Sequence, residues 1–296
     1  MPADTVINGK RNADPIAVRP ALARRFGKMP ANLSLSIGIA LVAIPCLAAI
    51  LAPLLTGSDP LALGADILRP PGAAHPMGTD DLGRDVFARV LYGGRISLMV
   101  GLFSALIAVS VGTLIGTIAG YFGGRTDEVL MRVTEIFQIV PRFLLAIVVV
   151  ALLGGGQLKI ILIIGLLSWP GTARIIRSQL LVLRGEEFVL AATMSGASPA
   201  RIITRHILPN VVPFMIVSGS LQTAAGVLVE SYLSFLGLGD PSHPSWGLLL
   251  QQAQLYLQQA WWMSAFPGLS LSITILGLNL TGDGLASRLG ARSVSR

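Results

Sequence analysis

Apolar residues gather in long runs along this chain, separated by polar and charged segments. Six runs stand out, at residues 33–55, 96–122, 129–153, 160–169, 207–236 and 261–280. A helix of about 20 apolar residues crosses a bilayer core about 30 Å thick. Helices also satisfy their own backbone polar groups, which lipid cannot do. The pattern therefore predicts an all-α membrane protein with six transmembrane helices.

Three of these runs have individual features. The second is rich in glycine and serine, which allow close helix packing, so we expect it inside the bundle. The third is interrupted by Pro141 and by three charged residues. The fourth ends at the Trp-Pro-Gly sequence 169–171, and it spans only if its helix continues toward Arg174.

The predicted organisation has five segments. They are an N-terminal arm at 1–32, a first transmembrane helix at 33–55, an external segment at 56–95, a core domain at 96–285 with a long inner loop at 170–210, and a tail at 286–296. The arm lacks the short apolar core and cleavage site of a secretory signal. The first helix is therefore expected to remain in the protein.

Basic residues indicate the side of the membrane on which each segment lies. Of the 22 Lys and Arg residues, 15 lie in the arm, the turn after the second run, the 170–210 loop and the tail. Four lie in the 56–95 segment. Because cytoplasmic segments carry an excess of Lys and Arg, both termini are predicted to be cytoplasmic.

Composition excludes several classes of protein. Only 12% of the residues are charged, whereas soluble domains have about 25%. A soluble enzyme or a disordered regulator is therefore excluded. The net charge of +7 is explained by orientation in the membrane, so membrane lipids are expected partners and nucleic acid is not. One cysteine and three separated histidines predict neither a disulfide framework nor a metal site.

The external segment contains a predicted amphipathic helix. From Asp85 onward, apolar residues such as Val86 and Val90 recur at helical spacing, which is typical of a helix lying on a membrane surface. Asp80, Asp81 and Asp85 could together bind calcium or magnesium. Because they precede a helix start, the sequence favours capping and turn roles for them.

The inner loop contains two predicted short helices. The first begins at Glu187, carries an Ala-Ala-x-x-x-Gly surface and ends near Gly196. The second runs from Pro199 to Leu208 and stops at Pro209. The small-residue surface is suited either to internal packing or to close contact with another protein.

Residues 187–210 resemble the cytoplasmic loop signature of ATP-binding-cassette importer permeases. That signature is Glu-Ala-Ala, three residues, Gly, nine residues and Ile-x-Leu-Pro. The residues that match in register are Ala191, Ala192, Gly196, Leu208 and Pro209. Leu190 stands in place of the glutamate and His206 in place of the isoleucine. Both departures resemble the peptide/nickel branch, in which an acidic residue lies four places before the first alanine of the pair, here Glu187.

Other segments resemble the C-type permeases of dipeptide and oligopeptide importers. They are Gly-Thr-Asp-Asp-Leu-Gly-Arg-Asp-Val-Phe-Ala-Arg at 78–89, Tyr-Gly-Gly-Arg-Ile-Ser-Leu at 92–98, Ser-Phe-Leu-Gly-Leu-Gly at 234–239, Pro-Ser-Trp-Gly at 244–247 and Gly-Asp-Gly-Leu at 282–285. These matches are in the same order as in the family. They identify the branch but not the cargo.

The resemblance implies the type I ABC importer permease fold, in the bacterial cytoplasmic (inner) membrane. It also implies three kinds of protein partner: a second, B-type permease, two ATP-binding-cassette ATPase subunits, and an extracytoplasmic solute-binding protein. The chain contains no Gly-x-x-x-x-Gly-Lys-Ser/Thr sequence that would hold nucleotide phosphates. ATP and magnesium are therefore expected on the ATPase subunits, and this chain is expected to have no catalytic residue or cofactor.

The same resemblance makes the 187–196 helix a coupling helix that seats in a groove of an ATPase and moves the attached spans. The residues expected to couple are Glu187, Ala191, Ala192, Gly196, Arg205 and Pro209. The small residues would allow close contact, and Glu187 and Arg205 would make polar contacts. Pro209 would end the loop.

Three ionisable residues inside spans are candidates for the translocation path, because such residues commonly face cavities or partners. Arg142 stands where the family usually has a small or apolar residue. It could attract a peptide carboxylate, extend to the membrane surface, or pair with a glutamate of the second permease. Glu135 could pair with Arg132, three residues earlier on a helix. Glu230 could contact substrate or could serve helix packing or gating.

The expected function is that of a membrane-spanning subunit of an ATP-driven peptide importer. The same type of complex could instead import nickel chelates, glutathione or another small solute. A secondary transporter would need an ion relay and, in many cases, inverted repeats. An intramembrane enzyme would need a nucleophile and base, or a metal set, within its spans. The sequence shows neither pattern.

Overall fold

The computed structural model describes residues 31–57 and 59–294. All but the last two residues of the predicted N-terminal arm therefore lie outside the described residues. Within these ranges the structure is helical, with one isolated β-bridge between Thr79 and Asp85.

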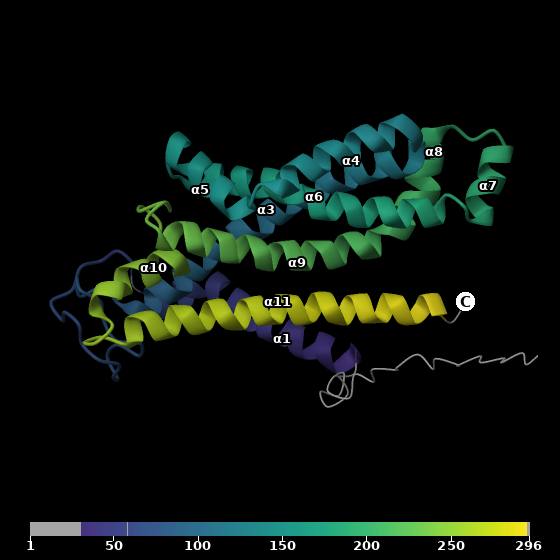
Figure 1. Ribbon diagram of the computed structural model, residues 1–296. Coiled ribbons are helices and arrows are strands. Elements are labelled where there is room, and N and C mark those ends of the chain that lie inside the picture. The colour runs from purple at the N-terminus through teal and green to yellow at the C-terminus, as the bar shows by residue number, and fades with distance from the viewer. Residues whose placement is uncertain (1–30, 58, 295–296) are drawn as a thin grey trace, which may run out of the picture. The chain divides into compact units, whose positions relative to one another are not determined.

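The helices follow one another in an order that Figure 1 shows. They are α1 (Ala31–Ile50), α2 (Ala52–Thr56), α3 (Val86–Phe122), α4 (Gly124–Ile139), α5 (Arg142–Leu153), α6 (Gln157–Leu183), α7 (Glu187–Met194), α8 (Pro199–Ile202), a π-helical turn (Ile203–Ile207), α9 (Leu208–Phe235), α10 (Trp246–Ala253), a 3₁₀ turn (Gln254–Tyr256) and α11 (Trp262–Val294).

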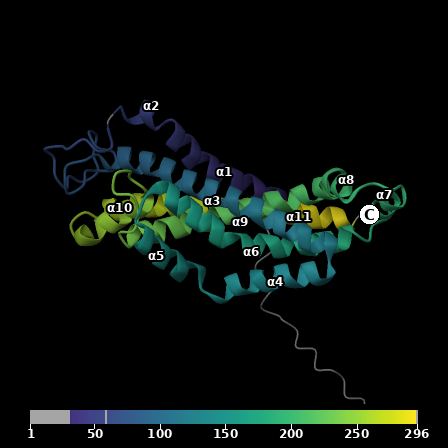
Figure 2. The ribbon, with the colours of Figure 1, turned by 90° about the horizontal axis from the view of Figure 1, so that it is seen from above.

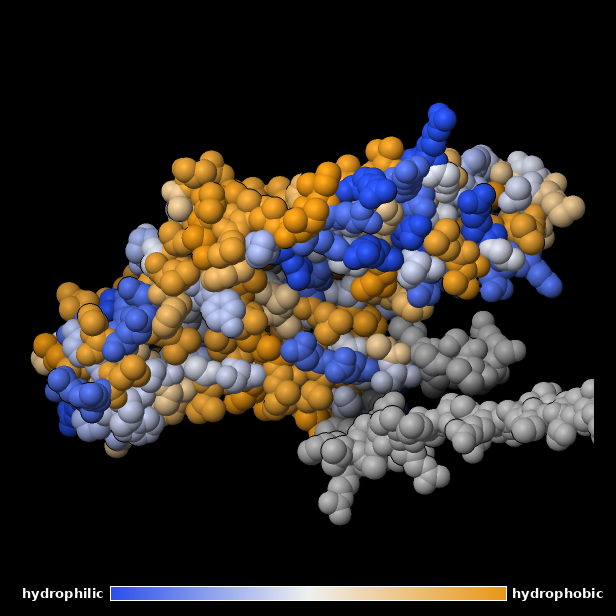
Figure 3. Space-filling view, viewed as in Figure 1, coloured by the Kyte–Doolittle hydropathy of each residue, from blue (hydrophilic) through white to orange (hydrophobic). Residues whose placement is uncertain are grey.

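Five helices are long and apolar enough to cross a bilayer, and the bent pair α4–α5 makes a sixth when it is counted as one span. The five are Asn32–Ile50, Val86–Phe122, Gln157–Leu183, Pro199–Phe235 and Trp262–Arg288. On the face shown in Figure 3, hydrophobic residues cover much of the middle, and hydrophilic residues gather toward the two ends. The predicted all-α fold with six spans is confirmed.

The two ends of the helices differ. Helices α7 and α8 lie at one end, together with the C-terminal end of α11 (Figures 1 and 2). The segment before α3 and helix α10 lie at the opposite end. The inner loop and the external segment of the prediction are therefore on opposite sides of the spans.

The third predicted span is broken. Helix α4 ends at Ile139, α5 begins at Arg142, and their axes are bent by 78°. The break falls at Pro141, which has no N–H for a helical hydrogen bond and crowds the preceding turn. The interruption in the sequence thus marks a real change of direction.

The fourth predicted span is longer than its apolar run. Helix α6 continues through Pro170 to Leu183, and it therefore includes Arg174 and Arg177. Membrane helices tolerate an internal proline where neighbouring groups satisfy the freed carbonyl. The predicted loop boundaries, 170–210, were therefore too wide at the N-terminal side.

Helix α3 packs most extensively against α6. A Cβ atom on Gly116 would lie 2.5 Å from the carbonyl oxygen of Ala173, and one on Gly112 would lie 2.7 Å from that of Trp169. Only glycine allows two helix backbones to come so close. The predicted interior position of the second span is confirmed.

Two predicted segments are not separate from the spans. Residues 86–95 are the first turns of α3 rather than a distinct amphipathic helix on the membrane surface. Their apolar residues Val86 and Val90 are buried against α10 and α11 instead of facing lipid. The predicted tail is likewise part of α11, which continues to Val294.

Candidate functional site

Helix α7 is held on a small core of its own. The side chain of Val189 is buried and packs in a cluster with Ile176 and Leu180 of α6 and with Ile202 and Ile207 of the following segment. Burial of a side chain of this size stabilises a fold by about 1.5–3 kcal/mol. The loop helix is therefore anchored to the end of α6 and the start of the next span.

Gly196 terminates α7. Its backbone has a φ of +77°, in the left-handed region, where a side chain costs roughly 1–2 kcal/mol. The N–H of Ala197 bonds to the carbonyl of Ala192 at 3.1 Å, and the N–H of Gly196 to that of Thr193 at 3.0 Å. This pair of bonds is a Schellman motif. The geometry thus requires Gly196 for the helix end, whatever it contacts in a complex.

The opposite face of α7 is exposed. Residues at positions i, i+3, i+4 and i+7 share one side of a helix, and here they are Glu187, Leu190, Ala191 and Met194. The last is 90% exposed and Leu190 is 51% exposed. We call these four residues the outward face of α7. Leu190 and Met194 are not among the residues predicted to couple, although their helical spacing from Glu187 places them on the same side.

The residues expected to couple this chain to an ATPase do not all lie on the outward face of α7. Glu187 and Ala191 lie on the outward face, whereas Ala192 turns inward and packs against the core beneath α7. Arg205 is exposed and lies on the π-helical turn rather than on α7.

Pro209 does not end the loop. Helices α8 and α9 and the π-helical turn between them form one span-length helix, Pro199–Phe235. The N–H of Leu208 bonds to the carbonyl of Ile203, five residues back. This wider turn accommodates the proline ring, which would clash with the carbonyl of an ordinary preceding turn. The prediction of a helix stop at Pro209 was therefore wrong, and the non-helical part of the loop ends at Ser198.

Two arginines tie α6 to α4. Arg177 donates to both carboxylate oxygens of Asp127, from Nε at 2.5 Å and from Nη2 at 2.6 Å. Arg174 donates from Nη1 to Oε1 of Gln138 at 2.6 Å. These contacts join the helix that leads into α7 to the first half of the broken span. Sequence analysis had assigned both arginines to the loop.

Arg142 lines two adjoining cavities at the bend between α4 and α5. The first, of about 280 Å³, is lined by Gln138, Val140, Pro141, Arg142, Pro170 and Gly171. The second, of about 260 Å³, shares Pro141 and Arg142 and adds apolar side chains that include Phe143, Ile164, Leu167 and Val229. The arginine is exposed.

The other two candidates for a translocation path line neither of these cavities. Glu135 is exposed and forms an ion pair with Arg132 at 3.4 Å. Glu230 is only 2% exposed and accepts hydrogen bonds from Ser97 of α3 at 3.0 Å and from Ser234 at 2.7 Å. The geometry therefore favours helix packing for Glu230.

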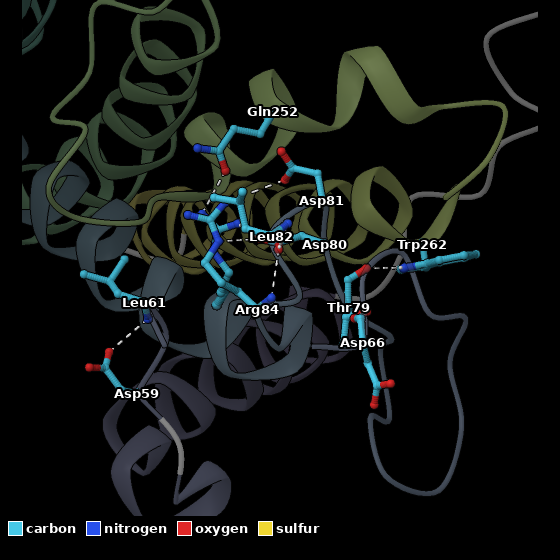
Figure 4. A network of polar contacts seen from close by, with 11 residues as sticks. Asp59, Leu61, Asp66, Thr79, Asp80, Asp81, Leu82, Arg84, Gln252 and Trp262 are labelled. Atoms are coloured by element: carbon cyan, nitrogen blue, oxygen red, sulfur yellow. Dashed lines mark hydrogen bonds and ion pairs between the residues drawn. The ribbon is translucent and has the colours of Figure 1, made fainter. Parts of the chain in front are cut away.

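A polar network holds the external segment (Figure 4). Asp80 is buried and accepts hydrogen bonds from the side chains of Arg84 and Arg89 and from the backbone N–H groups of Leu82 and Arg84. Arg89 also donates to Gln252 at 2.8 Å. The turn role predicted for Asp80 and the capping role predicted for Asp85 are confirmed, since Asp85 caps α3 through the N–H of Ala88.

The two tryptophans at the start of the last span, Trp261 and Trp262, differ in exposure. Trp262 is buried and donates from its ring nitrogen to the carbonyl of Thr79 at 3.0 Å (Figure 4). Trp261 is 58% exposed. Only Trp261 therefore has the exposure expected of a residue at the membrane interface.

Asp240 lies in the turn between α9 and α10. Partial burial by itself would raise the pKa of this carboxyl. Hydrogen bonds from the N–H of Ser242, at 2.9 Å, and from His243 outweigh that effect, so the pKa lies below its ordinary value. The charged carboxylate is therefore the form that stabilises the turn.

Comparison with known proteins agrees with this architecture. Residues 112–294, more than half of the chain, match the family model "Binding-protein-dependent transport system inner membrane component". The dipeptide transport system permease protein of Alkalihalophilus pseudofirmus is 39% identical over 272 residues, which cover 91% of this chain and 90% of that protein. The oligopeptide transport system permease protein of Bacillus subtilis is 37% identical over 257 residues, 86% of this chain and 84% of that protein.

A solved structure has the same fold. The inward-facing MetNI methionine ABC transporter superposes with a TM-score of 0.56 at 18% identity, over 70% of this chain and 96% of that chain. This likeness confirms the predicted type I importer permease fold. The chain therefore belongs to the family of binding-protein-dependent transport system inner membrane components, the permeases of ATP-binding-cassette importers.

Proposed function

We propose that this chain is the C-type permease subunit of an ATP-driven importer that carries peptides across the bacterial cytoplasmic membrane. The names of the relatives support this cargo, since two of them, matched over more than 80% of both lengths, are dipeptide and oligopeptide permeases. The motifs in the external segment and the inner loop support the assignment to this branch of importers.

The proposed complex has five protein chains. This permease pairs with a B-type permease, two ATPase subunits bind on the cytoplasmic side, and a solute-binding protein delivers the cargo from outside. ATP and magnesium bind to the ATPase subunits, and this chain supplies the moving pathway.

The outward face of α7 is the observation that carries the proposal. Large apolar side chains that remain exposed on a polar loop mark a protein contact. Helix α7 is anchored through Val189 to the end of α6 and to the helix that becomes α9. A force applied to its outward face therefore reaches two spans directly. In our proposal, closure of the ATPase subunits applies that force and drives the spans between inward and outward states.

The proposed orientation places α7 and both termini in the cytoplasm. The C-terminal end of α11 lies at the α7 end of the helices (Figures 1 and 2). The excess of Lys and Arg in the inner loop and the arm supports the same orientation.

Reconstitution of the complex tests the proposal. Liposomes that contain this chain, the second permease and the ATPase subunits are expected to accumulate radiolabelled dipeptide only with ATP at the ATPase side and binding protein at the other side. Omission of any one component should abolish uptake. Purification of the chain from gently solubilised membranes without an ATPase or a second permease would contradict the proposal. Uptake of a nickel chelate or glutathione but of no peptide would support the importer function and contradict the proposed peptide cargo.

A further inference from the structure

The bend in the broken span creates a cavity near the middle of α6. Pro141 and Arg142 line it from the α4–α5 break, and Pro170 and Gly171 line it from α6. Helix α6 has 27 residues, which corresponds to about 40 Å, and Pro170 lies midway along it. The cavity is therefore about 20 Å from either end of that helix.

The charge of Arg142 is uncompensated there. In the part of the chain that the structure describes, its side chain has no ion pair or hydrogen bond, and neither cavity is lined by an acidic residue. The nearest carboxylate on the same broken span, that of Glu135, is already paired with Arg132. A charge held at such a depth is expensive and is retained where a cavity or ligand requires it.

The remaining lining divides into a polar and an apolar part. Gln138 lines the first cavity, and its amide oxygen is occupied by Arg174, so its amide nitrogen remains available as a donor. The second cavity is lined by Phe143, Ile164 and Val229. An anionic group would therefore suit the first cavity, and an apolar side chain attached to it would suit the second.

We infer that Arg142 binds the terminal carboxylate of a peptide during its passage, with the adjoining apolar cavity taking the side chain of the last residue. This inference rests on the proposed peptide-import function and adds a specificity for the free carboxylate. Arginine suits the role because its planar fork donates two parallel hydrogen bonds to a carboxylate. Each cavity is slightly smaller than a typical small-molecule site, and Pro141 and Arg142 line both of them.

The experiment compares two cargoes that differ only in this group. Liposomes with the complete importer receive binding protein saturated with alanyl-phenylalanine or with its C-terminal amide, so that delivery is equal and the ratio of uptake rates reports on the permease. The wild-type complex is expected to take up the free acid about tenfold faster, which corresponds to about 1.4 kcal/mol. Arg142→Gln should reduce this ratio to about one, and Arg142→Lys should leave an intermediate ratio.

Arg132→Gln is the matched control, because it removes an exposed arginine from the same broken span. It should leave the ratio unchanged. The inference is overturned if the wild-type complex takes up the free acid and the amide at equal rates. It is also overturned if Arg142→Gln leaves the ratio of the two uptake rates unchanged, including by lowering both rates equally. Loss of the second permease from purified Arg142→Gln complex overturns it too, because this would assign the charge to an intersubunit ion pair. If the Arg142→Gln variant does not insert into the membrane, the ratios of free-acid to amide uptake in the wild type and in Arg142→Lys test the inference instead. Failure of the wild type to take up either peptide would instead contradict the proposed function.

Discussion

Arg177 of α6 and Asp127 of α4 form a two-hydrogen-bond ion pair, with distances of 2.5 and 2.6 Å. The pair connects the helix that leads into the inner loop to the first half of the broken span. Since the carboxylate is mostly buried, the contact is more than a surface charge pair. It ties the helix that leads into α7 to the start of α4.

Breaking this pair should uncouple hydrolysis from transport. We expect Arg177→Gln and Asp127→Asn each to lower the amount of peptide imported per ATP hydrolysed, while assembly with the ATPase persists. A double-mutant cycle on thermal stability should give an interaction energy of about 0.5–3 kcal/mol. Arg125→Gln, an exposed position on the same helix, serves as the control. Additive effects of the two substitutions, with normal transport, would show that the pair transmits nothing.

The outward face of α7 predicts an effect on ATPase binding. Met194→Asp places a charge on a side chain that is 90% exposed, so folding should be unaffected while docking into an apolar groove is disfavoured. The amount of ATPase that co-purifies should decrease at least tenfold. Leu255→Asp changes a side chain that is 85% exposed at the other end of the helices and should leave co-purification normal. Equal recovery of ATPase with both variants would argue against docking through α7.

The close approach of α3 and α6 predicts a difference between two glycines. Gly116→Ala would place a Cβ 2.5 Å from a carbonyl oxygen of α6, whereas nothing lies within 4 Å of the same atom on Gly219 of α9. We expect the first substitution to destabilise the protein by about 1–3 kcal/mol. Gly219→Ala should be neutral or stabilise by up to about 1 kcal/mol, through helix propensity. Thermal unfolding in detergent measures both, and equal melting temperatures would contradict the described packing.

The buried carboxylate of the external segment predicts a third difference in stability. Asp80→Asn removes the charge that balances Arg89, which is only 2% exposed, and loss of one buried partner costs about 3–5 kcal/mol. Asp66→Asn breaks an exposed pair with Arg69, for which about 0–1 kcal/mol is expected. Because Trp262 contacts this segment, its fluorescence should report the unfolding. Similar losses for both variants would show that the Asp80 network contributes little.

Much of this fold follows from the sequence because membrane spans need long apolar runs and helix ends need particular residues. The six spans and the end of α7 near Gly196 are predicted in this way, and Pro141 is recognised as an interruption of the third span. The positions of prolines and charged residues led to wrong predictions for other helix boundaries. Pro170 and Pro209 suggest helix ends, but α6 continues through Pro170, and a π-helical turn precedes Pro209. A proline in the sequence does not by itself show whether a membrane helix ends or continues there.

The site could be predicted only in part. The inner-loop motif identified α7, but its direction of exposure, with Met194 outward and Ala192 inward, depends on the core beneath it. The partners of Arg174 and Arg177 lie 36 and 50 residues earlier in the chain. Glu230 stands as an isolated charge in an apolar run. Its partner Ser234 lies one turn later on the same helix, but Ser97 is brought to it only by the packing of α3 against α9.

In our proposal, α7 transmits the action of an ATPase to the spans. A photo-reactive amino acid placed at position 194 in native membranes shows which protein contacts this helix. We expect a cross-link from position 194 to an ATP-hydrolysing subunit, and none to that subunit from position 255. Cross-links from position 194 to lipid or to this chain alone, in a complex that still transports, would contradict it.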